Sequence, residues 1–243
     1  MDFECFEYEE IPELRWHSTS FGDDPQNEDF AEVDETEDEE SIDLSQLSDT
    51  LKFVLERVQS IYGCGMDLKT LEHWVDDTFD EISGGTEEDY QLLKDFASTE
   101  LGITVIEADL RNEAHGIQNS FTSKITIDSK LDTSKRIYVL SHELGHALFA
   151  PDPGEYLKKL TFVEEVEAES VSMVMCKHLG VDCMPSAELY INYWLKYGRY
   201  PPDEVLPLLD EDIVSATDRI KQGLDRLNSS SRMDIDFTFT DDE

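Results

Sequence analysis

Basic residues, cysteines and long apolar runs are all scarce in this sequence. Only 19 Lys and Arg stand against 57 Asp and Glu, which gives a formal net charge of −38 at pH 7. An excess of carboxylates repels the phosphates of nucleic acids, so direct nucleic-acid binding is not expected. The charge favours a basic protein partner, or it serves only solubility.

The cysteine pattern and the hydropathy bear on the compartment. The 4 cysteines include no Cys-x-x-Cys pair, and no signal peptide precedes them. Free thiols in a reducing, cytoplasmic setting are therefore expected. No apolar run approaches the ~18 residues that suggest a membrane-spanning helix, so no membrane span is predicted.

Acidic residues are concentrated at the two ends of the chain. The first fifty residues hold 19 acidic side chains and a single basic one, Arg15. Such a composition is typical of disorder, so residues 1–45 are predicted to be a disordered acidic tail. Residues 229–243, Ser-rich and then acidic, are predicted to be a second tail. The remaining residues, 46–228, have the length of one domain.

The predicted domain begins with helices at 46–101 and continues with a sheet. Apolar residues recur at helical spacing from 47 to 61 and from 68 to 82. Thr86 and Asp89 form the pattern of a capping box before a third helix. The period then changes, and short strands are predicted at 103–108, 116–119 and 124–128.

The next helix carries a His-Glu-x-x-His motif. An apolar stripe from 137 to 148 indicates one continuous helix. His142 and His146 lie one turn apart on the same face, where two imidazoles can bind one metal ion. Glu143 lies between them and can act as a general base toward water.

A second helix, from about 162 to 179, is predicted to complete the metal site within residues 102–180. A zinc hydrolase site usually has three protein ligands. Glu165, Ala168 and Glu169 share one face of this helix, and the small Ala allows close approach to the first metal helix. We predict Glu165 as the third Zn²⁺ ligand and Glu169 as the acceptor for the free N–H of a ligating His. Further helices are predicted at 186–228.

These motifs resemble the ImmA/IrrE family of zinc-dependent peptidases, in the gluzincin-like group. The resemblance is carried by His-Glu-Leu-Gly-His at 142–146 and Glu-x-x-Ala at 165–168. The run from Glu165 through Gly180 to Leu195 is also similar to the C-terminal metallopeptidase domain of ArdC-type antirestriction proteins. Together these similarities cover roughly residues 86–228.

The resemblance implies an α+β, zincin-like metallopeptidase domain, mainly helical, with a small sheet before the metal helix. An edge strand of that sheet can hold an extended substrate by backbone pairing. The implied substrate is a specific protein, often a helix-turn-helix repressor, whose cleavage releases genes after stress or on mobile elements. Relatives use a Tyr or His to stabilise the oxyanion, for which Tyr190, Tyr193 and His178 are candidates. The sensor-like domain of some members and the DNA-binding domain of ArdC are not found in these residues, so neither activity is expected.

Two other interpretations of the motif remain open. The chain could be an acidic antirestriction or inhibitor protein that binds a basic protein surface and uses zinc only as a structural ion. The motif could also be an amphipathic helix with two incidental histidines. Replacing Glu143 separates a peptidase from a binding protein, because only the peptidase needs a general base.

Overall fold

The computed structural model describes residues 44–110, 114–149 and 161–236. Most of the predicted N-terminal tail, residues 1–43, therefore lies outside the described residues. The same is true of the end of the predicted C-terminal tail, residues 237–243. The described elements are η2 (Leu44–Gln46), α1 (Asp49–Tyr62), α2 (Leu68–Phe79), β1 (Ser83–Gly84), α3 (Glu87–Glu100), β2 (Thr104–Ala108), β3 (Gly116–Asn119), β4 (Lys124–Asp128), α4 (Thr133–Phe149), α5 (Thr161–Leu179), β5 (Val181–Asp182), α6 (Met184–Gly198), α7 (Pro202–Val205), η3 (Leu206–Leu209) and α8 (Asp210–Asp236).

The helix starts follow from side chains that satisfy free backbone N–H groups. Ser48 accepts from Leu51 N at the start of α1. Thr86 and Asp89 form the predicted capping box of α3, with both reciprocal hydrogen bonds present. Asp132 accepts from Lys135 N and so caps α4, the helix that carries the His-Glu-x-x-His motif.

The predicted three-stranded sheet is present, with the order β2-β4-β3. β2 runs parallel to β4, whereas β3 runs antiparallel to it with Gln118 opposite Ile125. A short turn connects β3 to β4, in which Asn119 accepts from Thr122 N and Ser123 has a positive φ of 48°. β3 is consequently an edge strand, and it packs against α4.

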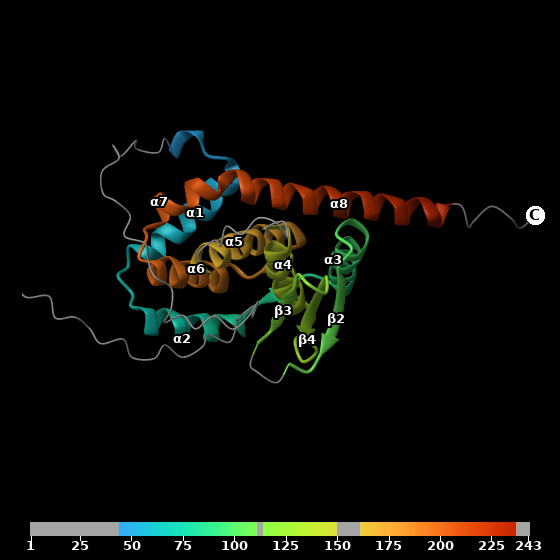
Figure 1. The fold of residues 1–243 in the computed structure, drawn as a ribbon, viewed down its shortest axis with the longest axis horizontal. Helices are drawn as coiled ribbons and strands as arrows, with labels where there is room; N and C mark the ends of the chain where they lie inside the picture. The colour runs from blue at the N-terminus through green and yellow to red at the C-terminus, as the bar shows by residue number, and fades with distance from the viewer. Residues whose placement is uncertain (1–43, 111–113, 150–160, 237–243) are drawn as a thin grey trace, which may run out of the picture.

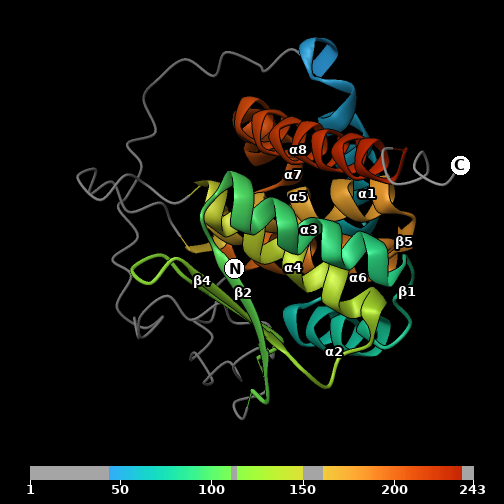
Figure 2. The same cartoon turned by 90° about the vertical axis from the view of Figure 1, so that its right-hand side faces the viewer.

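The two central helices are α4 and α5, which share the most extensive contact between any two elements that the structure describes. α4 lies between α3 and α5, and the sheet lies beside α4 and α3 (Figure 1). Figure 2 shows α3 in front of α4, with α8 above and α2 below. Each central helix is buried on most sides, so both polar faces of the predicted site are inside the protein.

The buried apolar side chains form one core around α4 and α5. Its fully buried members from the other helices and the sheet include Leu51, Val54, Leu71, Tyr90, Leu93, Phe96, Ile125, Ile127, Ile191, Leu206 and Ile220. Within the described residues the protein is mostly helical with a small mixed sheet, which agrees with the predicted α+β class. No helix of the described ranges is both long and apolar enough to span a membrane.

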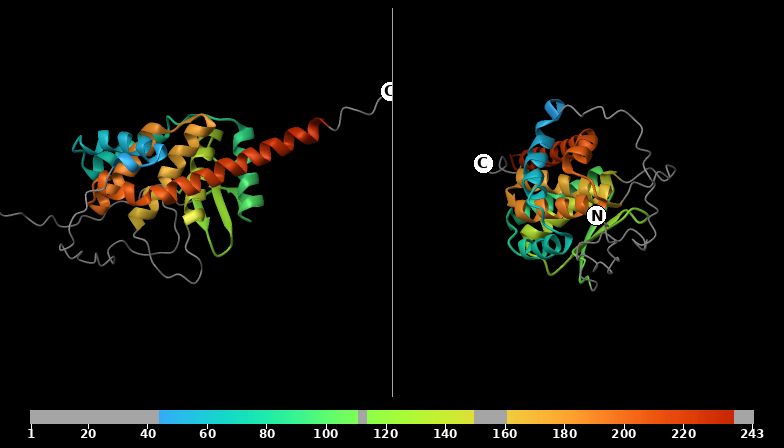
Figure 3. Two further views of the ribbon diagram at one scale, coloured as in Figure 1. Left: turned by 90° about the horizontal axis from the view of Figure 1, so that it is seen from above. Right: turned by 90° about the vertical axis from the view of Figure 1, so that its left-hand side faces the viewer.

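Two predicted helix boundaries were wrong, the end of α8 and the start of α6. α8 continues to Asp236, so the tail predicted at 229–243 is helical in its first part, and the end of α8 projects past the other helices (Figure 3). The Ser-rich stretch there has a low helix propensity, which is why the sequence suggested an earlier end. α6 begins at Met184 instead of Ser186, because Pro185 suits the first turn of a helix.

Candidate metal centre

The two polar faces predicted from the sequence meet where α4 crosses α5. Tyr138, His142 and His146 follow one another at intervals of four residues along one face of α4. Glu165 and Glu169 do the same on α5, and their side chains are buried against that face. Because side chains four residues apart lie one turn apart, the two helices present their polar groups to each other in register.

His142, His146 and Glu165 converge on one point. Each offers a possible ligand atom, and these atoms all lie within 4.8 Å of one another. The two Nε2 atoms are 3.0 Å apart. Oε2 of Glu165 is 3.5 Å from Nε2 of His142, and its Oε1 is 3.5 Å from Nε2 of His146. Two imidazoles and one carboxylate are the donors of a known type of zinc site.

Glu169 contacts the far side of His142. Its Oε2 is 2.8 Å from Nδ1 of His142, so the imidazole can donate Nδ1–H to this carboxylate and keep Nε2 for a metal ion. The structure thus places Glu169 where the sequence predicted it. Its other oxygen, Oε1, accepts a hydrogen bond from the hydroxyl of Tyr138 at 2.6 Å, a contact that the sequence analysis missed.

Glu143 lies between α4 and the edge strand β3. The backbone N–H of Gln118 donates to its carboxylate. A Cβ at Gly116 would lie 2.7 Å from Oε1 of Glu143 and 2.5 Å from Cγ1 of Val139, so only glycine lets β3 approach the helix this closely. Oε2 of Glu143 is buried and has no hydrogen-bond partner among the described residues.

The environment shifts the acid–base equilibria of this cluster. Burial raises the pKa of Glu143 to about 7, although the charge of His142 opposes the effect. Burial also lowers the pKa of His146 to about 4. Burial acts to raise the pKa of Glu165, but the charge of His146 and the hydrogen bond from His142 outweigh it and the pKa is lowered. At neutral pH, His146 is therefore neutral and Glu165 ionised, the states in which both can bind a metal. Burial acts to lower the pKa of His142, but its hydrogen bonds to Glu165 and Glu169 outweigh this and raise the pKa well above its ordinary value, so this ring would have to release a proton on binding a metal.

Of the three candidates for oxyanion stabilisation, only Tyr190 lies at this cluster. Its hydroxyl donates to Oε2 of Glu165 at 3.0 Å, and its ring contacts that of His142 edge to face. Tyr193 instead packs against Trp194 and Tyr197.

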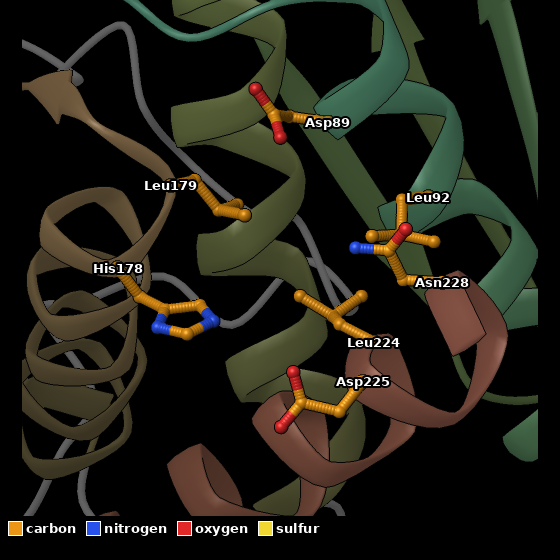
Figure 4. A pocket seen from close by; sticks show the side chains of 7 residues that line it. All are labelled: Asp89, Leu92, His178, Leu179, Leu224, Asp225 and Asn228. Atoms are coloured by element: carbon orange, nitrogen blue, oxygen red, sulfur yellow. The ribbon is translucent and has the colours of Figure 1, made fainter. Parts of the chain in front are cut away.

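His178 lies in a different part of the molecule. It is at the end of α5, in a pocket whose other lining residues come mainly from α3 and α8 (Figure 4). Its side chain therefore cannot act on a substrate bound near His142, and the candidacy inferred from the resemblance is wrong for this residue.

The close approach of α4 and α5 depends on Gly145. A Cβ at this position would lie 2.8 Å from Cα and 3.2 Å from Cβ of Ala168. Because Cα is a backbone atom, the helices themselves would have to move. We expect Gly145→Ala to reduce the free energy of unfolding by ~1–3 kcal/mol, as overpacking typically does, and to weaken zinc binding. Chemical denaturation and zinc titration measure the two effects.

The matched control for this prediction is Gly63→Ala. Gly63 has a φ of −66°, which alanine also adopts, and a Cβ there would meet only Gln59 O at 3.5 Å. Its free energy of unfolding should change by less than ~0.5 kcal/mol. Equal effects of the two substitutions would show that the α4–α5 approach does not depend on Gly145.

Comparisons with known proteins do not assign the site. No family model matches the chain, and no solved structure matches it. A stretch of 83 residues is 31% identical to an uncharacterised protein of Bacillus anthracis. It covers 34% of this chain and only 14% of that protein, so the chain corresponds to a small part of its length.

Proposed function

We propose that the protein is a zinc-dependent peptidase with a zincin-like fold, related to the ImmA/IrrE family. One observation carries the proposal: possible ligand atoms of His142, His146 and Glu165 converge within 4.8 Å of one another at a buried helix crossing. Glu143 lies beside them, and Glu169 holds the first histidine by its other ring nitrogen.

The donor set fits zinc better than the hard cations. Mg²⁺ and Ca²⁺ prefer sites made of oxygen atoms, whereas imidazole nitrogens suit zinc and similar metals. The buried Oε2 of Glu143, without a hydrogen-bond partner among the described residues, leaves an acceptor available for water. Zinc held by these three residues would supply Lewis acidity, which lowers the pKa of water and polarises a carbonyl group.

Glu143 is the residue suited to move protons in the hydrolysis. A pKa of about 7 lets its carboxylate take a proton from water near neutral pH and then give that proton to the leaving amine. The Gln118 N–H fixes the carboxylate against β3. Tyr190, which donates to Glu165, is the only one of the predicted oxyanion candidates within reach of the same region.

The edge strand β3 favours an extended peptide as the substrate. His115 O accepts from Asp128 N, so the backbone groups of His115 point toward β4. Backbone groups alternate along a strand, and those of Gly116 and Gln118 therefore lie on the side of β3 that faces away from β4. Apart from the Gln118 N–H, which Glu143 uses, these groups have no backbone hydrogen bond within the described residues, and such groups can pair with a substrate strand beside the general base.

We expect the acidic N-terminal segment to increase the rate at which a basic protein substrate associates. We expect removal of residues 1–43, which lie outside the described residues, to leave the thermal transition nearly unchanged. It should slow substrate cleavage at low salt and have little effect at high salt, because the Debye length falls from ~30 Å at 0.01 M to ~3 Å at 1 M. Cleavage rates of full-length and truncated protein at both salt concentrations measure this. A faster truncated enzyme would instead indicate autoinhibition.

An unbiased substrate screen tests the proposed function. Zinc-loaded wild-type protein and Glu143→Gln are each incubated with a library of proteome-derived peptides, and new termini are identified by mass spectrometry. We expect new termini with the wild type alone, enriched next to basic sequences. Identical sets of new termini from both proteins would reject the assignment of Glu143 as general base.

A further inference from the structure

Tyr138 is a buried residue next to the candidate metal centre that the proposed mechanism does not use. It lies on α4 one turn before His142, and its side chain is almost fully buried. Its hydroxyl donates to Oε1 of Glu169 at 2.6 Å. The same carboxylate contacts Nδ1 of His142 through Oε2 at 2.8 Å. The three side chains therefore form one continuous set of hydrogen bonds that ends at a candidate ligand.

The Glu169 carboxylate depends on hydrogen bonds from both Tyr138 and His142. A buried carboxylate costs free energy unless its oxygens are hydrogen-bonded, and Glu169 finds its two partners in Tyr138 and His142. With Oε1 held by the hydroxyl, the carboxylate cannot turn about its last bond, and Oε2 stays aligned with the imidazole. Without the hydroxyl, that rotation becomes possible and the His142 ring loses its fixed acceptor.

Tyr138 is itself firmly held. Its backbone carbonyl accepts a hydrogen bond from Oγ of Ser172 on α5 at 3.0 Å, and its ring packs 6.3 Å from that of Phe79. Burial and the negative charge of Glu169 raise the pKa of Tyr138 well above its ordinary value, so the hydroxyl remains a donor. Because Tyr138 belongs to α4 and is also bonded to α5, its hydroxyl has a fixed position and can fix the orientation of the Glu169 carboxylate.

We propose that Tyr138 is a positioning residue: through Glu169 it fixes the orientation of His142, with Nδ1–H toward the carboxylate and Nε2 toward His146 and Glu165. The consequence for catalysis rests on the proposed function. The hydrogen-bond arrangement itself does not, and it can be tested in protein without metal.

The first test is the spectrum of the His142 ring in metal-free protein. The sequence has only 6 histidines, so selective ¹⁵N-histidine labelling gives a simple spectrum. We expect a slowly exchanging Nδ1–H signal of His142 in the wild type and its loss or marked shift in Tyr138→Phe. The matched control is Tyr90→Phe, which removes another buried hydroxyl that donates to a carboxylate, that of Glu107 at 3.3 Å. An unchanged His142 signal in folded Tyr138→Phe would overturn the proposal.

The second test is zinc affinity in a double-mutant cycle. Tyr138→Phe should weaken zinc binding by about 10-fold, at the lower end of the 10–100-fold effects typical of residues that orient a ligand. In a Glu169→Ala background, Tyr138→Phe should have almost no further effect, because the carboxylate through which it acts is gone. Equal losses in both backgrounds would show that Tyr138 does not act through Glu169.

Two further outcomes are distinguishable. If Tyr138→Phe does not fold, Glu169→Gln replaces it. Tyr138 and His142 contact different oxygens of Glu169, and in glutamine one of these positions is an NH2 group that cannot accept a hydrogen bond, so the Nδ1–H signal should again change. An unchanged signal would overturn the proposal. If wild-type protein binds no zinc, the proposed function fails, whereas the spectrum of metal-free protein still decides the role of Tyr138.

Discussion

Glu143→Gln is expected to abolish hydrolysis while the protein stays folded and binds zinc normally. The amide has nearly the shape of the carboxylate, but it cannot accept a proton from water. Loss of a general base typically costs 10²–10⁴-fold in rate. We therefore expect kcat for a substrate from the peptide screen to fall by about this factor. The rate of peptide hydrolysis and the zinc content of the same preparation are the two measurements.

Two comparisons make this result specific. Glu88→Gln removes an exposed carboxylate in the first turn of α3 and should leave the hydrolysis rate unchanged. Glu165→Gln should weaken zinc binding, because Glu165 contributes its carboxylate to the cluster. If Glu143→Gln lost zinc as completely as Glu165→Gln, the roles of base and ligand would be wrongly assigned.

His146→Ala is expected to remove zinc from the purified protein. Nε2 of His146 is 3.0 Å from that of His142, and only two of the three candidate ligands would remain. The affinity should therefore fall by more than the ~100-fold upper range for residues that only orient a ligand. Competition with a chromophoric chelator measures the dissociation constant.

The control for His146→Ala is His73→Ala. His73 is an exposed residue of α2 that pairs with Asp77, and its loss should leave zinc affinity unchanged. If His146→Ala retained wild-type affinity, the metal would have to bind elsewhere. Zinc that is fully retained in Glu143→Gln but lost in His146→Ala would instead agree with the assigned roles.

Zinc binding without peptide hydrolysis would favour the other interpretation, an acidic inhibitor protein with a structural zinc ion. An acidic inhibitor with a structural metal ion would lose partner affinity when zinc is removed, yet it would tolerate Glu143→Gln. The position of Glu143 against the backbone of Gln118, with its second oxygen lacking a partner among the described residues, agrees better with a base that acts on water.

The site could be predicted largely from spacing within helices. His142 and His146, or Glu165 and Glu169, share a face whenever the helix forms. An apolar stripe predicted the first of these helices, and the spacing of Glu165, Ala168 and Glu169 indicated the second. The small Ala168 indicated a close crossing, and the structure shows Gly145 opposite it. The sheet was also predictable, because alternation and turn residues determine short strands locally.

Contacts between elements could not be predicted in the same way. Tyr138 also lies at a spacing of four before His142, so that spacing was an available signal. However, a tyrosine in an apolar stripe reads as core until its partner Glu169 is known. The Gln118 N–H and Gly116 contact Glu143 through tertiary packing, which no periodicity encodes. β1 and β5 are two residues long each, too short to give a pattern.

The most direct test of the central claim is the zinc K-edge X-ray absorption spectrum of freshly purified protein, prepared without chelator, together with its zinc content. The account predicts about one zinc per chain, a coordination shell of nitrogen and oxygen at roughly 2.0–2.2 Å, and the outer-shell scattering of two imidazoles. The outer-shell signal of one imidazole should disappear in His146→Ala. Absence of zinc, or sulfur scattering at about 2.3 Å from cysteine ligands, would contradict the account.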